Sequence, residues 1–302
     1  MPATLAWPKG PVDVILDTDA YNEIDDQFAI AYLMRSGEKL RCKAICAAPF
    51  HNSKSDGPAD GMEKSYHEIL KILTLMGRED FYPQVFRGSD YWLPDENTPV
   101  DSPAAREIVH LARTHSPEQP LYVLGIGAIT NIASALLLAP EIAENIVVVW
   151  LGGHALHWEK QNEFNLQGDI AAARAVFLSG ASLVQLPCMG VVSAFATTKP
   201  ELEYWLLGKN ALCDYLAQNT INEAESYASG KPWSRVIWDV TAIGWLLGGL
   251  MRDRVVPRHV PGYDFQYETR PDLPPMRYVC HVDRDRLMAD LFAKLACGGA
   301  TA

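Results

Sequence analysis

The chain has 302 residues, of which 48% are hydrophobic and 21% charged, and this suits a globular enzyme with an ample core. Its formal net charge of -11 argues against nucleic acid and anionic membranes as partners, because their phosphates would repel it. No secretory signal is apparent at the N-terminus, and the six cysteines form no CxxC pair, so we expect reduced, buried thiols in a cytoplasmic protein.

Apolar runs rich in Val, Ile and Leu alternate with segments of helical period as far as residue 190. The runs are continuously apolar, which is typical of strands covered on both faces in a mainly parallel sheet. This order predicts an open, doubly wound, Rossmann-like α/β fold with its core sheet at about 12–190. The expected strands are 12–16, 43–48, 121–126, 145–151 and 182–186, and the expected helices are 25–36, 61–77, 102–115, 129–138 and 169–180.

Beyond residue 200 the pattern becomes helical. Short strands are expected within about 253–282, before a last helix near 283–297. The longest apolar run, VTAIGWLLGGLM (240–251), is too short to span a bilayer and predicts a buried helix. There is no repeat or linker, so the whole chain, 1–302, is interpreted as a single domain.

Five carboxylates are concentrated in DTDAYNEIDD (17–26), where a strand ends and a helix begins. Ligand sites in open α/β sheets form beyond the carboxyl ends of the strands, so these side chains are expected to face one place. Two carboxylates about 4 Å apart repel by on the order of 4 kcal/mol at an effective dielectric near 20. A hard divalent cation, Ca²⁺ or Mg²⁺, is therefore preferred here over a solvated acidic turn.

Outside the carboxylate cluster, a few single residues are also candidates for a structural or functional role. Asp239 lies in an apolar helix, where an unpaired carboxylate is costly, so a metal or a salt bridge is expected beside it. Asp169 is expected to cap a helix. His51 and His157, in loops after strands, are the histidines considered for a site. P-loop, HExxH and GxSxG motifs are absent from the sequence, which excludes the enzyme classes that depend on them.

Four segments, in order along the chain, resemble the motifs of one enzyme family. DTD…IDDQFAI resembles a DxDPGxDDxxAI signature, and GAITNIASALLL (127–138) resembles a GPLTNLA segment. VVVWLGG (147–153) with EFN (163–165) resembles an MGG…EFN segment, and WDVTAIGWLL (238–247) resembles a late Asp-containing helix. The family is that of the inosine–uridine-preferring nucleoside hydrolases, and the resemblance runs from about residue 12 to 250. It implies hydrolysis of ribonucleosides to ribose and free base, by a homodimer or homotetramer.

The resemblance also implies a role for individual residues. The ligands of a Ca²⁺ ion would be Asp19, Asp26, Asp239 and the backbone carbonyl of Thr130. The groups that hydrogen-bond the ribose hydroxyls would be Asp25, Asn52, Glu163 and Asn165. Asp19 would also act as the general base toward the attacking water, and Asp17 would support the site from behind the ligands. Such carboxylates suit the chemistry, because glycosidic cleavage develops positive charge on the sugar.

The chain departs from the family pattern in three places. DAYNEIDD carries two residues more than DPGIDD, and GGHALHWEKQNEFN is about two residues short. Trp238 stands where many members carry a His that protonates the leaving base. A Trp–Asp pair here resembles the purine-preferring branch, in which the Trp ring stacks on the base.

Trp238 is accordingly predicted to act in catalysis by stacking, with Tyr91 and Trp92 covering the other face of a preferred purine base. The alternative is that Trp238 only packs in the core beside Asp239. For the protein as a whole, two alternatives stay open: hydrolysis of another ribosyl compound, and a catalytically weak protein that binds ribose or nucleosides.

Overall fold

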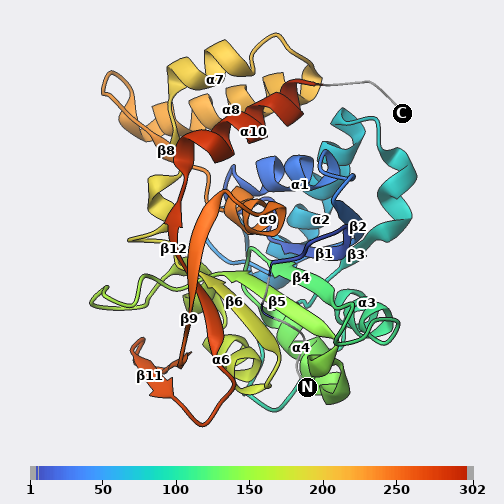
Figure 1. Cartoon of the computed structure of the whole chain (residues 1–302). Helices are drawn as coiled ribbons and strands as arrows, with labels where there is room; N and C mark the ends of the chain where they lie inside the picture. The colour runs from blue at the N-terminus through green and yellow to red at the C-terminus, as the bar shows by residue number, and fades with distance from the viewer. Residues whose placement is uncertain (1–4, 6, 298–302) are drawn as a thin grey trace.

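The computed structural model describes residue 5 and residues 7–297. An eight-stranded sheet forms its centre, and only the last pair of neighbouring strands is antiparallel (Figure 1). In spatial order the strands are β3 (Val85–Arg87), β2 (Leu40–Ala47), β1 (Val12–Thr18), β4 (Leu121–Gly125), β5 (Ile146–Leu151), β6 (Ser182–Leu186), β12 (Met276–Val282) and β9 (Met251–Val256). The first six follow the order of a doubly wound sheet, so the predicted fold class is confirmed.

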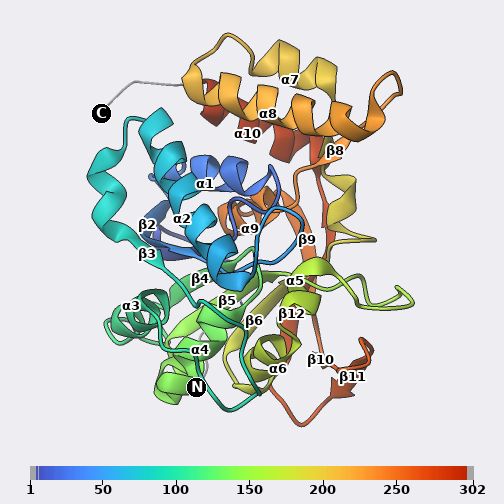
Figure 2. The same cartoon turned by 180° about the vertical axis from the view of Figure 1, so that it is seen from behind.

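Helices cover both faces of this sheet (Figures 1 and 2). One face is covered by α1 (Asp26–Met34), α2 (Pro58–Leu75) and α9 (Val240–Leu247), and outside these helices lies a further layer of α7 (Lys199–Trp205), α8 (Ala211–Ala228) and α10 (Arg284–Ala296). The other face packs against α3 (Pro103–Ala112), α4 (Thr130–Leu138) and α6 (Ile170–Leu178). The short α5 (Phe164–Gly168) precedes α6.

The central strands are continuously apolar because both of their faces are buried. In β4, Leu124 belongs to the hydrophobic cluster on the α1 face, whereas Val123 belongs to the cluster on the α4 face. Val149 and Trp150 of β5 alternate in the same way. Side chains point alternately to opposite faces of a strand, so a strand with two covered faces has no polar positions to interrupt its apolar run.

The prediction that the core sheet ends near residue 190 is wrong. β12 pairs with β6 in parallel, and β9 then pairs with β12 as the edge strand. The sequence of β9, MRDRVV, carries three charged residues and has exposed positions. An edge strand has one unpaired side and is less covered, so it lacks the apolar signal by which the inner strands were recognised.

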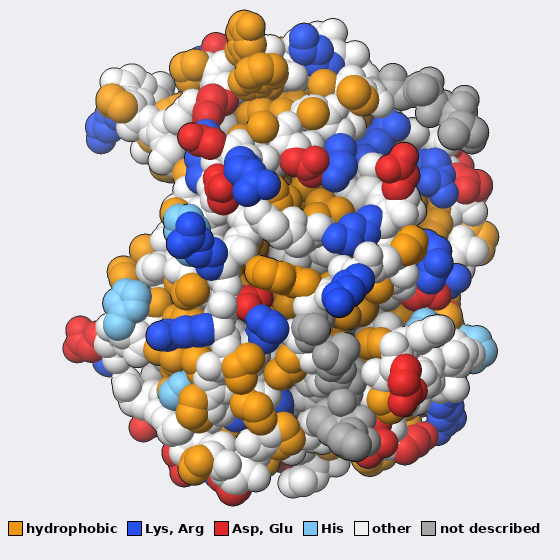
Figure 3. Space-filling model, in the orientation of Figure 1, with side chains coloured by type: hydrophobic (Ala, Val, Ile, Leu, Met, Phe, Trp, Pro, Cys, Tyr) orange, Lys and Arg blue, Asp and Glu red, His pale blue; other side chains and the backbone are white. Residues whose placement is uncertain are grey.

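Two smaller antiparallel pairs complete the strands, β7 (Ala196–Thr197) with β8 (Arg235–Val236), and β10 (Arg258–Pro261) with β11 (Tyr267–Arg270). All six cysteines are free, but Cys280 and Cys297 are exposed rather than buried as predicted. Among the described residues, no helix combines the length and the apolar character that crossing a membrane would require. Figure 3 shows acidic and basic side chains interspersed over one face of the molecule.

Candidate active site

A pocket of about 190 Å³ lies beyond the carboxyl ends of the central strands. The chain leaves β1 for β2 on one side and later returns to β4 on the other, so β1 and β4 flank the switch point where such folds bind ligands. Seven of the predicted site residues line this pocket together: Asp19, Asp25, Asp26, Glu163, Asn165, Trp238 and Asp239.

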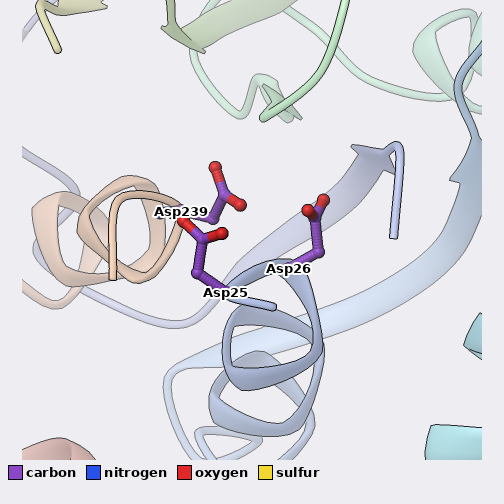
Figure 4. A group of neighbouring side chains, drawn as sticks. All are labelled: Asp25, Asp26 and Asp239. Atoms are coloured by element: carbon purple, nitrogen blue, oxygen red, sulfur yellow. Dashed lines mark hydrogen bonds between the residues drawn. The ribbon is translucent and has the colours of Figure 1, made fainter. Parts of the chain in front are cut away.

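Three carboxylates converge at the meeting point of two helix starts. Asp25 and Asp26 lie in the first turn of α1, and Asp239 immediately precedes α9 (Figure 4). One carboxylate oxygen from each lies within 4.8 Å of those of the others, and all three residues are buried. The backbone N–H of Asp239 donates to Asp25 Oδ2 at 3.3 Å. Among the described residues no Lys, Arg or His forms an ion pair with Asp239, so the salt bridge that the sequence offered as one alternative is not formed there, and the role of Asp239 as a metal ligand stays a prediction.

Burial raises the pKa of every carboxyl in this cluster. The pKa of Asp25 rises to about 8 through burial and then through the charges of Glu23 and Asp26. Burial raises the pKa of Asp26 to about 6, against the hydrogen bond from Thr18. The pKa of Asp239 is raised well above its usual range, by burial and by the neighbouring aspartates. The cluster therefore resists full ionisation unless a cation or protons neutralise it.

Asp19 is held by the loop that is longer than in the family pattern. The side chain of Asn22 donates to Asp19 Oδ2 at 3.1 Å and accepts from Asn52 Nδ2 at 2.7 Å. Burial, followed by the charge of Asp26, raises the pKa of Asp19 well above its usual range. Asn52, predicted to contact ribose, does not line the pocket and instead supports Asn22.

Asp17 and Thr130 lie behind the pocket. Asp17 Oδ1 accepts from Asn131 Nδ2 at 2.7 Å, while burial raises the pKa of Asp17 to about 7. Thr130 begins α4, and its Oγ1 donates to Asp169 at 2.7 Å. Asp169 accepts from the backbone of Ala172 and caps α6, as predicted. The use of the Thr130 carbonyl as a metal ligand stays a prediction.

Glu163 and Asn165 form one wall of the pocket. Glu163 caps α5, because its carboxylate accepts from the backbone N–H groups of Gly153, Asn165 and Leu166 at 2.9, 2.9 and 3.0 Å. Both amide hydrogens of Asn165 are used, on the carbonyls of Ile126 and Leu151. The Oδ1 of Asn165 therefore remains as an acceptor for a ligand hydroxyl, and the contact of Glu163 with ribose stays a prediction.

The structure separates the aromatic residues predicted to enclose the base. Trp238 lines the acidic pocket and also packs against the hydrophobic core. Trp92 lines a neighbouring hollow with His51, and Phe164 borders both spaces. Tyr91 is exposed. The predicted stack between Trp238 and Trp92 is thus not brought together in one pocket.

Comparison with known proteins identifies the family of this chain. The family model described as inosine-uridine preferring nucleoside hydrolase matches residues 14–287. The chain belongs to this family. Membership places it among hydrolases of N-glycosyl compounds.

Relatives of this nucleoside hydrolase differ in the base they prefer. A pyrimidine-specific ribonucleoside hydrolase of Citrobacter koseri is 29% identical over 57% of this chain and 58% of its own length. That of Salmonella paratyphi A is 25% identical over 78% and 79%. Among solved structures, a purine-preferring ribonucleoside hydrolase from Gardnerella vaginalis is similar with a TM-score of 0.74 and 20% identity, over 94% and 98% of the chains. A plant nucleoside hydrolase, PpNRh1, reaches a TM-score of 0.75 at 20% identity, over 95% and 99%.

Sequence reasoning missed several residues of the nucleoside hydrolase pocket. Asn22, His154, Cys188 and Met189 line it, although none was a candidate. His154 follows the Gly152–Gly153 pair at the end of β5, and this position was the available signal. His51 and His157 were considered instead, and neither lines the acidic pocket.

Proposed function

We propose that this nucleoside hydrolase cleaves the N-glycosidic bond of ribonucleosides with the help of Ca²⁺ and prefers purine nucleosides. The observation that supports this most strongly is the set of three buried carboxylates within 4.8 Å of one another, in the same pocket as Asn165 and Trp238. Acidic groups and a free amide oxygen suit the sugar, and an indole ring suits the base.

The donor set fits a hard divalent cation. Asp26 and Asp239, together with Asp19 beside them, offer only oxygen atoms, and burial raises the pKa of all three. We infer that these carboxylates and the Thr130 carbonyl hold the ion. When bound, it would supply charge that anchors the vicinal ribose hydroxyls and makes a nearby water more acidic.

The remaining steps follow from the side chains. Asp19 accepts the proton of the water that attacks C1′, because its carboxylate lines the pocket and can act as a general base when it is ionised. Asp25 and the Oδ1 of Asn165 accept hydrogen bonds from ribose hydroxyls and fix the sugar. As the bond to the base breaks, the surrounding negative charge stabilises the positive charge on the sugar ring.

The preference for purines rests on Trp238. Its ring can stack on a base, a contact worth about 1–3 kcal/mol, and a larger ring system gains more from it. The pyrimidine-specific relatives are similar to this chain at 25–29% identity, so base preference needs measurement.

A panel of nucleosides and other ribosides tests the proposal, with reducing sugar as the readout in Ca²⁺ and in EDTA. We expect ribose to be released faster from inosine and guanosine than from uridine and cytidine. In EDTA we expect no release from any of them. Release only from unusual ribosides would instead support hydrolysis of another ribosyl compound, and binding without turnover would support a binding protein. Asp239→Asn is the matched inactive control.

The predicted assembly and location are also proposals. We propose a cytoplasmic homodimer or homotetramer, on the family resemblance alone. Light scattering of the purified protein measures its mass, and a monomer would contradict the proposal.

A further inference from the structure

His154 lies in a part of the pocket that is built from two strand-end loops held rigidly together. The loop after β5 and the loop after β6 bond through their backbones, Cys188 to Gly153 at 2.8 Å and Ala155 to Met189 at 2.9 Å. Gly153 has a φ of 69°, and a Cβ there would lie 2.3 Å from the hydroxyl of Tyr267. Only glycine fits this turn, which sets the chain direction immediately before His154.

The backbone of His154 is fixed from a second side. Its N–H donates to Oε1 of the buried Gln161 at 2.7 Å, and Gln161 Nε2 donates in turn to the carbonyl of Ala155 at 3.3 Å. The His154 ring also makes an edge contact with Trp158, with the ring centroids 6.1 Å apart. These contacts hold the imidazole at the pocket wall before any substrate arrives.

The hydrogen bond to the ring defines which nitrogen carries the proton. The backbone N–H of Met189 donates to His154 Nδ1 at 3.3 Å, so Nδ1 must present its lone pair. In the neutral ring the hydrogen then resides on Nε2. No hydrogen bond joins Nε2 to another residue in the part of the chain that the structure describes, so this N–H is available to a ligand.

The surroundings keep the ring neutral. Burial lowers the pKa of His154, and no carboxylate hydrogen-bonds to the ring among the described residues. Protonation of the ring would also put a hydrogen on Nδ1, and two donors, that N–H and the backbone N–H of Met189, would then face each other. His154 is therefore suited to donate a hydrogen bond and poorly suited to transfer a proton.

We propose that His154 recognises the leaving base, donating a hydrogen bond from Nε2 to a ring-nitrogen or carbonyl acceptor of that base. This inference rests on the proposed function. When the C1′–N bond breaks, its electron pair passes to the base, and the acceptor atom gains negative charge. The Nε2–H bond strengthens at that moment and so favours the transition state. His154 keeps its proton, Asp19 takes one from water, and the base takes one from solvent.

Two substrates and three variants test this. The leaving group of inosine is a base with hydrogen-bond acceptors. The leaving group of p-nitrophenyl riboside is p-nitrophenolate, which spreads its negative charge over its own ring and nitro group and so departs without help from a donor. For His154→Leu we expect kcat/KM for inosine to fall about 10- to 100-fold, as for one hydrogen bond to an acceptor that gains charge, and kcat/KM for p-nitrophenyl riboside to change less than threefold. His154→Gln, which keeps an N–H donor, should recover most of the loss. His157→Leu, on the same loop but outside the pocket, is the control and should match wild type.

An equal loss on both substrates would overturn the proposal, since it would indicate a structural role, and so would an unchanged rate on inosine. Failure of the proposed function looks different: the wild-type protein itself would then release ribose from neither substrate.

Discussion

Removal and return of Ca²⁺ should change both the stability and the proton content of this protein. At 4.8 Å and an effective dielectric near 20, each ionised pair among Asp25, Asp26 and Asp239 repels by about 3 kcal/mol, or roughly 10 kcal/mol for three pairs. The ion-free protein relieves this by keeping protons, in keeping with a pKa of about 8 for Asp25. Binding of the ion should therefore release about one proton or more near pH 7.

The sign of the pH effect follows from the direction of these shifts. A carboxyl with a higher pKa in the folded than in the unfolded chain binds more protons when folded, so the free energy of unfolding falls as pH rises between the two values. For Asp25 this window runs from 3.8 to about 8. The ion-free protein should lose stability over that range by about 1.4 kcal/mol per pH unit and carboxyl at most. In the ion-bound protein the carboxylates are already ionised, so its stability should not fall over this pH range.

Thermal unfolding and calorimetry measure both effects. With free Ca²⁺ at about 1,000 times its Kd, the gain of about 4 kcal/mol should raise the Tm by roughly 6 °C, and by more at pH 8 than at pH 6. Titration calorimetry in buffers of different ionisation enthalpy gives the protons released. Asp272→Asn, at an exposed carboxylate, should behave as wild type, and Asp239→Asn should lose the response. An unchanged Tm together with no proton release would refute the reasoning.

Three substitutions test the other roles. Asp19→Asn should lower kcat by at least 10²-fold, because it removes the base, and activity within a few-fold of wild type would contradict this assignment. Asp25→Asn should raise KM more than it weakens Ca²⁺ binding, whereas Asp26→Asn should do the reverse; isothermal titration and initial rates separate the two. Trp238→Ala should lower kcat for inosine far more than for p-nitrophenyl riboside, and equal losses, or a wild-type preference for uridine, would rule out stacking catalysis.

The core of the fold could be predicted because its signal is local. Strands such as β4 and β5 are apolar at every position, and their order along the chain alternates with amphipathic helices. β12 and the edge strand β9 could not be recognised as part of this sheet. Their sequences are partly polar, and their place depends on the pairing of β12 with β6 across about 90 residues of chain. Such pairing is set by packing, which a single sequence does not display.

The site shows the same division. The carboxylates of α1 could be placed at a strand end from the sequence alone, because a strand, a turn and a helix start follow one another within a few residues. The contact of Asn22 with Asn52, and that of His154 with Met189, join loops that lie 30 and 35 residues apart. Neither pair has a spacing or motif that would indicate contact. Likewise, no motif indicates that Trp238 and Trp92 line two different hollows, both of which Phe164 borders.

The loop before α1, which is two residues longer than the family pattern, is held by contacts with other parts of the molecule. Glu23, in that loop, pairs with Arg235 at 2.6 Å, and Arg235 also pairs with Glu223 of α8 at 3.0 Å. Lys54 donates to the carbonyl of Asn22 at 2.8 Å from the loop after β2. The longer loop is thus fastened on two sides, so added length does not imply a looser site. Arg235 also lies near enough to Asp25 to lower its pKa, against burial and the neighbouring acids. This half-buried guanidinium, close to the carboxylates, therefore offsets part of their mutual repulsion.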